Sequence, residues 1–285
     1  MKKIWITGSR GRTGQALMSL LDVVEYEIFD TDKDEVDITD ENQVYSFIKM
    51  NRPDVIINCS GFHEKTGSLK ENVDHSYDVN AVGARNLAQA AEHINAKLIQ
   101  LSTDDIFSEK SETPYNEFDF PKPEGIYAKS KYAGERLVRE LMNRYVIIRS
   151  SWVYGIGTDF VDEVIEAAND ENVDTLVLDD NAYAVPTSAE ELAKIIKIFI
   201  DGEHYGIYHA VCSGGSCSRL EFANTVLEYT GLENKLKVVL KEGAKDKYSV
   251  LDNMMLRITG LPIPADWRVT LKKYIEETGE NSNGR

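Results

Sequence analysis

A tyrosine and a lysine stand four residues apart in the run YAKSK, as Tyr127 and Lys131. On a helix this spacing puts both side chains on one face, so an ammonium lies beside a phenol. A neighbouring cation favours the phenolate and lowers the pKa of tyrosine from its ordinary value of about 10. Such a phenol can give its proton to a carbonyl oxygen that is being reduced to an alcohol. Because the same spacing also occurs on solvated helix faces, the pair gains meaning only from its context.

A glycine loop close to the first residue supplies that context. The apolar run 4–7 is followed by GSRGRTG and then by an apolar helical pattern. In a strand–turn–helix unit, glycines permit a tight turn and a close approach of the backbone to a pyrophosphate, and the helix N-terminus attracts phosphate. We therefore predict a dinucleotide-binding loop that uses Gly8, Arg10, Gly11, Arg12, Thr13 and Gly14.

The identity of the dinucleotide depends on charges near this loop. The next apolar run ends at Asp30, where an acid can bind the hydroxyls of the adenosine ribose, which favours NAD. Arg10 and Arg12 argue for NADP, because a guanidinium can hold a 2′-phosphate. The sequence thus predicts NADH or NADPH as the cofactor and leaves the choice between them open.

Strand and helix patterns alternate along the first half of the chain. Apolar runs typical of buried strands lie at 55–59, 97–102 and 145–149, with helical patterns at 74–94 and around Tyr127. Strands separated by helices pair in parallel, and ligands lie beyond their carboxyl ends. We predict an α/β fold: a Rossmann-type doubly wound parallel sheet whose one edge gathers the glycine loop, Asp30, Ser60 to Phe62, and Ser102 to Asp104.

The pattern loosens after Arg149. Helical patterns cover 160–168, 188–200 and 218–229, and short strand patterns cover 176–178 and 208–211. We predict a dinucleotide-binding domain over 1–152 and a smaller, mixed α/β substrate region over 153–285, with the option that about 183–211 return to the first domain. The polar tail 276–285 is expected to fray.

Composition narrows the class of protein. With 32 Lys and Arg against 48 Asp and Glu, the net charge is −16, which argues against binding nucleic acid or an anionic membrane through the overall field. The three cysteines follow no zinc spacing, and we predict no metal site. With no long apolar stretch near the N-terminus, the expected location is the cytoplasm.

The assembled motifs resemble the dTDP-4-dehydrorhamnose reductases, a family of the extended short-chain dehydrogenase/reductases. Besides the glycine loop and Asp30, the similar segments are 37–40, 52–58, 79–81, 102–104, 127–131, 133–135, 149–155, 186–187, 249–253 and the region of Trp267. The resemblance implies a Rossmann domain with a small substrate domain. It also implies that NADH or NADPH reduces the 4-keto group of a nucleotide sugar, as in the conversion of dTDP-4-dehydrorhamnose to dTDP-rhamnose. A homodimer is left open.

The resemblance also implies roles for individual residues. Tyr127 would give the proton to the ketone oxygen, Lys131 would lower the pKa of Tyr127 and hold the nicotinamide ribose, and Thr103 would bind the substrate oxygen. Asp104 and Trp152 would lie near the sugar, although a tryptophan after a strand also often packs in a core. The remaining dinucleotide contacts would be Asp37, Ile38, Ser60, Gly61 and Phe62.

Four segments depart from the family pattern. Asp105 stands where the family commonly has an aromatic residue, and the loop 62–68, Thr158-Asp159 and Lys245-Asp246 also differ. The added carboxylate of Asp105 could repel an anionic substrate or turn outward. Most of the departures fall on the expected substrate side, so another nucleotide sugar remains open.

Two other classes of function remain open as well. An epimerase or dehydratase would use the same Tyr–Lys pair with a tightly held NAD, and Asp104 with Asp105 offers an acid pair beside the threonine. A non-catalytic subunit, like the regulatory subunit of methionine adenosyltransferase, shares this fold. The intact set of Thr103, Tyr127 and Lys131 argues against that second class.

Overall fold

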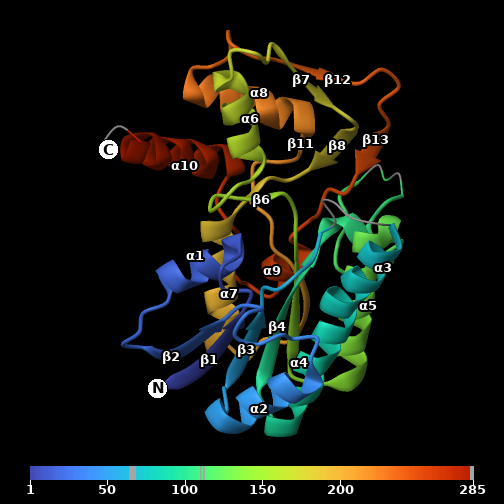
Figure 1. The fold of residues 1–285 in the computed structure, drawn as a ribbon, viewed down its shortest axis with the longest axis vertical. Coiled ribbons are helices and arrows are strands. Elements are labelled where there is room, and N and C mark those ends of the chain that lie inside the picture. The colour runs from blue at the N-terminus through green and yellow to red at the C-terminus, as the bar shows by residue number, and fades with distance from the viewer. Residues whose placement is uncertain (64–68, 110, 112, 283–285) are drawn as a thin grey trace.

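A six-stranded parallel sheet forms the centre of the computed structural model, which describes residues 1–63, 69–109, 111 and 113–282. The strand order is β10-β5-β4-β3-β1-β2, and every neighbouring pair is parallel (Figure 1). The strands are β1 Lys2–Thr7, β2 Tyr26–Thr31, β3 Val55–Asn58, β4 Lys97–Thr103, β5 Tyr145–Ser150 and β10 Gly206–His209. The predicted Rossmann-type α/β sheet is confirmed.

Helices cover both faces of the sheet, as the apolar strand sequences require. Successive side chains of a strand point to opposite faces, so Ile4 and Ile6 pack on one side and Trp5 on the other. The first layer holds α1 Arg12–Leu20 and α7 Ala189–Asp201, and the second holds α2 Glu41–Asn51, α4 Ala84–Ile94 and α5 Gly125–Leu141.

The prediction of a single helix over 74–94 is wrong. The chain forms α3 Leu69–Tyr77, a π-helical segment η1 Asp78–Gly83, and then α4. Asn80 in η1 is buried, accepts a hydrogen bond from the backbone N–H of Phe62, and donates to the Phe62 carbonyl and to Ser130 Oγ. The π segment thus connects the loop after β3 to α5, a tertiary contact that apolar periodicity does not encode.

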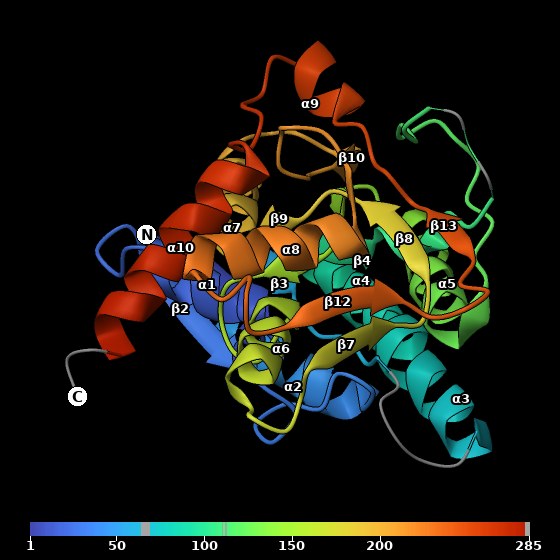
Figure 2. The same ribbon diagram turned by 90° about the horizontal axis from the view of Figure 1, so that it is seen from above.

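The second region lies over the carboxyl ends of the central strands (Figure 1). Its core gathers around buried Tyr154, Phe222 and Trp267. Figure 2 shows α8 between α10 and the pair β7–β12. Its elements are β6 Val153–Tyr154, α6 Phe160–Asn169, β7 Thr175–Leu178, β8 Asn181–Ala184, β9 Thr187–Ser188, β11 Cys217–Ser218, α8 Arg219–Thr230, β12 Lys237–Leu240, β13 Asp246–Tyr248 and α10 Trp267–Ser282. The short helix α9 Met254–Ile258 packs instead against β10 of the central sheet.

Helix α10 continues to Ser282, and the expected fraying of the polar tail from residue 276 stays a prediction. Leu271 and Ile275 bury one face of this helix against the second core. In the described part of the chain, no helix combines the length and apolarity needed to cross a membrane.

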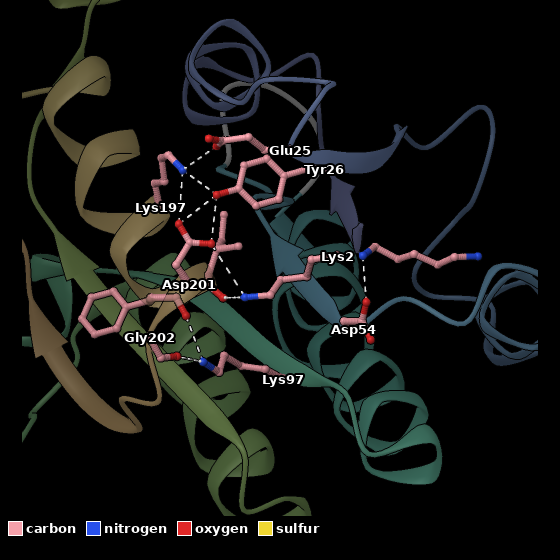
Figure 3. Close-up of polar contacts among 11 residues, drawn as sticks. Lys2, Glu25, Tyr26, Asp54, Lys97, Lys197, Asp201 and Gly202 are labelled. Atoms are coloured by element: carbon pink, nitrogen blue, oxygen red, sulfur yellow. Dashed lines mark hydrogen bonds and ion pairs between the residues drawn. The ribbon is translucent and has the colours of Figure 1, made fainter.

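Residues 189–209 pack with the first part of the chain, because α7 covers the sheet beside α1 and β10 pairs with β5. Polar contacts fix the end of α7 (Figure 3). Lys97 Nζ donates to the carbonyls of Phe199, at 3.0 Å, and Gly202, and Tyr26 Oη donates to Asp201 Oδ2 at 2.8 Å. The proposed boundary between residues 152 and 153 stays a prediction.

Candidate functional site

The glycine loop joins β1 to α1 as the sequence predicts. Gly8 has φ +64°, and a Cβ at this position would lie 2.7 Å from the backbone nitrogen of Ser60. A Cβ at Gly14 would lie 2.5 Å from the carbonyl oxygen of Gly8. No side chain caps the N-terminus of α1 at Gly11, so the first N–H groups of the helix remain available to an anion. The loop therefore has the close packing and free donors that a pyrophosphate site requires.

A cavity of about 250 Å³ opens beside this loop. The chain passes from β1 to β2 on one side and then to β3 on the other, so this is a topological switch point. Seven lining residues were predicted as dinucleotide contacts: Gly8, Gly11, Asp37, Ile38, Ser60, Gly61 and Phe62. The other lining residues are Asp32, Lys33, Val36, Cys59, His75 and Val79. The donor set and the glycine cradle suit a dinucleotide.

Asp30, Arg10 and Arg12 lie elsewhere. Asp30 is exposed and precedes the last residue of β2, whereas Asp32, two positions later, lines the cavity. The predicted strand ended too early because Thr31, a polar residue, belongs to β2 and accepts a hydrogen bond from the indole of buried Trp5. Arg10 forms ion pairs with Asp34, at 3.0 Å, and with Glu35.

Arg12 connects the two regions of the molecule. Its guanidinium donates to the carbonyl oxygens of Val153 at 3.4 Å and Thr158 at 2.9 Å. Asp159, next to Thr158, caps the start of α6 by accepting hydrogen bonds from Val161 and Asp162. The departure at Thr158-Asp159 therefore occupies a structural junction. Thr13 and Gly14 lie in the first turn of α1, outside the lining of the cavity.

A second cavity, of about 630 Å³, lies where the two regions meet. It is lined by Tyr127 and Trp152, both predicted, and by residues that sequence reasoning did not single out. These include Phe107, Glu124, Asp180, Arg219, Lys247 and Tyr248, and His63 of the altered loop also lines the cavity. They come from separate short elements of the second region and from loops, so no local spacing in the sequence connects them.

The phenol of Tyr127 lines this cavity and lies close to Thr103. Burial raises the pKa of Tyr127, and the carboxylates of Asp105 and Asp104 raise it further. The groups that lower it here are Thr103, through its hydrogen bond, and Arg12, rather than the expected Lys131. The phenol therefore stays protonated, which is the form that a proton donor needs.

Lys131 lies next to the dinucleotide cavity. Its ammonium is buried and donates to the carbonyl oxygen of Leu101 at 2.7 Å. Burial lowers the pKa of Lys131 to about 8, and Glu135 partly opposes this shift. A Cβ at Gly61, in the lining of the dinucleotide cavity, would lie 3.7 Å from Lys131 Nζ. Lys131 is thus within reach of a group bound in the dinucleotide cavity.

Asp104 and Asp105 have different surroundings. The Asp104 carboxylate is buried and accepts a hydrogen bond from Ser249 Oγ, and burial raises its pKa, with a further contribution from Asp105. Asp105 lines the larger cavity, and its Oδ2 accepts a hydrogen bond from Thr103 Oγ1 at 3.2 Å. Asp105 therefore faces the cavity, where the residue that departs from the family pattern is positioned to contact a bound ligand.

Trp152 combines the two roles considered for it. Its ring lines the larger cavity and also stacks on Phe222 of the second core, with ring centroids 6.2 Å apart. Its φ of +42° is unusual for a bulky residue and shows that the surrounding contacts determine its position. Its contact with a sugar stays a prediction.

The two other departures were also located. Residues 64–68 of the altered loop lie outside the described part of the chain, while the ring of His63 lies 4.7 Å from that of Tyr127. Lys245 and Asp246 both contact Asn181 at the start of β8, so they support the small sheet. Within the described residues, no three His, Cys, Asp or Glu side chains are grouped as metal ligands.

Comparison with known proteins identifies the family. The family model described as the RmlD substrate binding domain matches residues 1–280. Spore coat polysaccharide biosynthesis protein SpsK of Bacillus subtilis strain 168 is 34% identical over 284 residues, covering 97% of this chain and 98% of the relative. The dTDP-4-dehydrorhamnose reductase of Aggregatibacter actinomycetemcomitans is 34% identical over 218 residues, 73% of each chain.

A solved structure agrees with these relatives. The dTDP-4-dehydrorhamnose reductase of Bacillus anthracis strain Ames, crystallised in complex with NADP, superposes with a TM-score of 0.90 at 36% identity. The match covers 97% of this chain and 100% of the other. The resemblance noted from sequence is confirmed, and the chain belongs to the RmlD substrate binding domain family.

Proposed function

We propose that this chain uses NADH or NADPH to reduce the 4-keto group of a nucleotide-linked deoxysugar, with dTDP-4-dehydrorhamnose as the expected substrate. The observation that carries the proposal is the placement of Tyr127 and Lys131. The phenol of Tyr127, close to Thr103, lines the larger cavity, while Lys131 lies beside Gly61 of the dinucleotide cavity. The names of the relatives supply the class of substrate.

The residues divide the chemistry between them. A bound NADH or NADPH would supply a hydride to C4 of the sugar. Tyr127 donates its hydroxyl proton to the ketone oxygen, which becomes the alcohol, and Thr103 orients that oxygen by a hydrogen bond. The charge left on Tyr127 is stabilised by Arg12, the charged group that lowers the pKa of Tyr127, until a proton from solvent restores the phenol, while Lys131 would hold the nicotinamide ribose.

Oxidation of NADH and NADPH, followed by absorbance, tests this proposal. We expect turnover with dTDP-4-dehydrorhamnose to exceed turnover with other nucleotide 4-keto sugars, and Tyr127→Phe to remove it. Absence of oxidation with every sugar of the panel would overturn the proposal. Tightly bound NAD in the purified protein, without net oxidation, would instead identify an epimerase or dehydratase.

The cellular location, the partners and the oligomeric state belong to the same proposal. We place the protein in the cytoplasm, acting on a small nucleotide sugar and not on nucleic acid. The net charge of −16 and the three free cysteines support this placement. A homodimer remains a prediction, which light scattering of the purified protein would test.

A further inference from the structure

Arg219 occupies an unusual position in the larger cavity. It is the first residue of α8, directly after the capping residue Ser218, and it lines the cavity together with Tyr127. Its guanidinium lies 3.6 Å from the centroid of the Trp152 ring and 4.5 Å from that of Phe160. Two aromatic rings thus hold the planar group in place by cation–π contact, while its N–H edges bind no other group in the described part of the chain.

The guanidinium has no polar partner among the described residues. Lys247, the other Lys or Arg of the cavity lining, forms an ion pair with Asp180, whereas Arg219 takes part in no hydrogen bond or ion pair with the part of the chain that the structure describes. Arg268 offers a comparison, because it also stacks on a tryptophan, Trp267, at 4.2 Å. That arginine donates to the Gly214 carbonyl and to Glu221. Arg219 therefore keeps its donors available.

The charges around Arg219 point to an anionic ligand. Burial lowers the pKa of Arg219, but Asp104, Asp180 and Asp105 oppose this shift, and a guanidinium does not deprotonate in proteins. These same carboxylates would repel an anion in a cavity that had no free cation. A guanidinium edge binds two oxygens of a phosphate or carboxylate at once. Arg219 is thus positioned to offset the acidic surroundings for one oxyanion.

We propose that Arg219 binds the diphosphate of the nucleotide sugar and so determines the selection of nucleotide-linked substrates. This inference rests on the proposed function and names the group that recognises the anionic part of the substrate. Arg219 and Tyr127 line one cavity, so a diphosphate at Arg219 and a sugar at Tyr127 share it. Trp152, which touches Arg219 and lines the same cavity, couples the two positions.

The first experiment measures equilibrium binding of thymidine, dTMP and dTDP to the wild type, Arg219→Met and Arg268→Met. We expect Arg219→Met to weaken dTDP binding by at least about tenfold and to leave thymidine binding unchanged, because only the diphosphate needs the guanidinium. Arg219→Lys, which keeps the charge without the planar fork, should bind dTDP with intermediate affinity. Arg268→Met should match the wild type, and unchanged NADPH affinity would show that each variant is folded.

Three results would overturn the proposal. Equal dTDP affinity of the wild type and Arg219→Met would remove the role of Arg219. An equal loss for thymidine and dTDP would show that Arg219 only supports the ring of Trp152. A loss confined to UDP-glucuronate, with UDP-glucose and dTDP unaffected, would assign the oxyanion to a sugar carboxylate.

A kinetic measurement separates this inference from the proposed function. Reduction of dTDP-4-dehydrorhamnose by Arg219→Met with an unchanged KM would overturn the inference and leave the reductase assignment intact. If dTDP binding depends on Arg219 but the protein reduces no 4-keto sugar, the inference stands and the reductase assignment is overturned. Addition of Asp105→Ala to Arg219→Met should recover part of the lost dTDP affinity, since it removes one of the repelling carboxylates.

Discussion

The hydroxyl of Thr103 donates to Oδ2 of Asp105 at 3.2 Å, and the backbone N–H of Asp105 donates back to the same hydroxyl at 3.2 Å. A threonine hydroxyl has one proton, so a bond from Thr103 to a ketone oxygen requires the bond to Asp105 to break. The carboxylate of Asp105 thus competes with the substrate for the group that should orient it.

Asp105→Tyr should therefore lower the KM for dTDP-4-dehydrorhamnose severalfold. The substitution frees Thr103 and removes a negative charge that, at roughly 6 Å from an anionic group and an effective dielectric constant near 20, costs about 3 kcal/mol before screening by salt. Steady-state kinetics at two salt concentrations would measure the effect, which should shrink at high salt. A higher KM would indicate that the natural substrate carries an amino or other cationic group near Asp105.

Tyr127→Phe should reduce kcat by about 10²–10⁴-fold and leave the affinity for NADPH nearly unchanged. The ring is retained and only the proton is lost, so binding and folding should persist. Calorimetric titration with NADPH provides the binding control. Turnover at the wild-type rate would mean that another group, such as the nearby His63, supplies the proton.

Lys131→Met should lower both turnover and cofactor affinity, and it should also change how stability depends on pH. Burial lowers the pKa of Lys131 from 10.5 to about 8, so the folded wild type bears the cost of a buried ammonium below pH 8. Between pH 8 and 10.5 the folded chain releases this proton before the unfolded chain does. The free energy of unfolding of the wild type should therefore rise relative to Lys131→Met across that window.

Urea denaturation of both proteins measures this difference. The advantage of Lys131→Met should shrink by about 3 kcal/mol, an order-of-magnitude figure, as the pH rises from neutral to 10.5. Lys129→Met, which replaces an exposed lysine of the same helix, should run parallel to the wild type. A difference that stays constant with pH would contradict a buried charge at Lys131.

Glu135→Gln should destabilise the protein by about 3–5 kcal/mol, because it leaves the buried guanidinium of Arg149 without its counter-charge. The two side chains are almost fully buried, with Arg149 Nη2 2.7 Å from Glu135 Oε2. Replacement of Glu135 by Leu together with Arg149 by Met should lower the free energy of unfolding less than Glu135→Gln alone, since apolar residues of similar volume remove both charges. The midpoints of urea unfolding for the two variants decide the order.

Local chemistry made part of the site predictable. The spacing of Tyr127 and Lys131 follows from helix geometry alone, and the glycine loop follows from a strand–turn–helix order, so both could be located without coordinates. Arg219 could not be found in this way. Its importance comes from Trp152 and Phe160, which belong to different elements and meet it only after the second region has folded.

The errors in strand and helix prediction also come from contacts between distant parts of the chain. The end of β2 was missed because the polar residue Thr31 is held in the core by the indole of Trp5. The π segment around Asn80 was missed, and its buried Asn80 is bonded to the backbone of Phe62, 18 residues away, which apolar periodicity does not report. Periodicity reports which residues are apolar, whereas these features depend on which polar groups find partners across the fold.

The sixth strand of the central sheet, β10, comes from a part of the chain that follows the first strands of the second region. On the ribosome, the sheet therefore cannot be completed until residue 209 has emerged. Until then β5 would present an open edge, and the face that α7 later covers would remain bare. A nascent chain of about 150 residues would expose apolar surface and an unpaired strand edge. Synthesis of this protein therefore passes through a stage that favours chaperone binding.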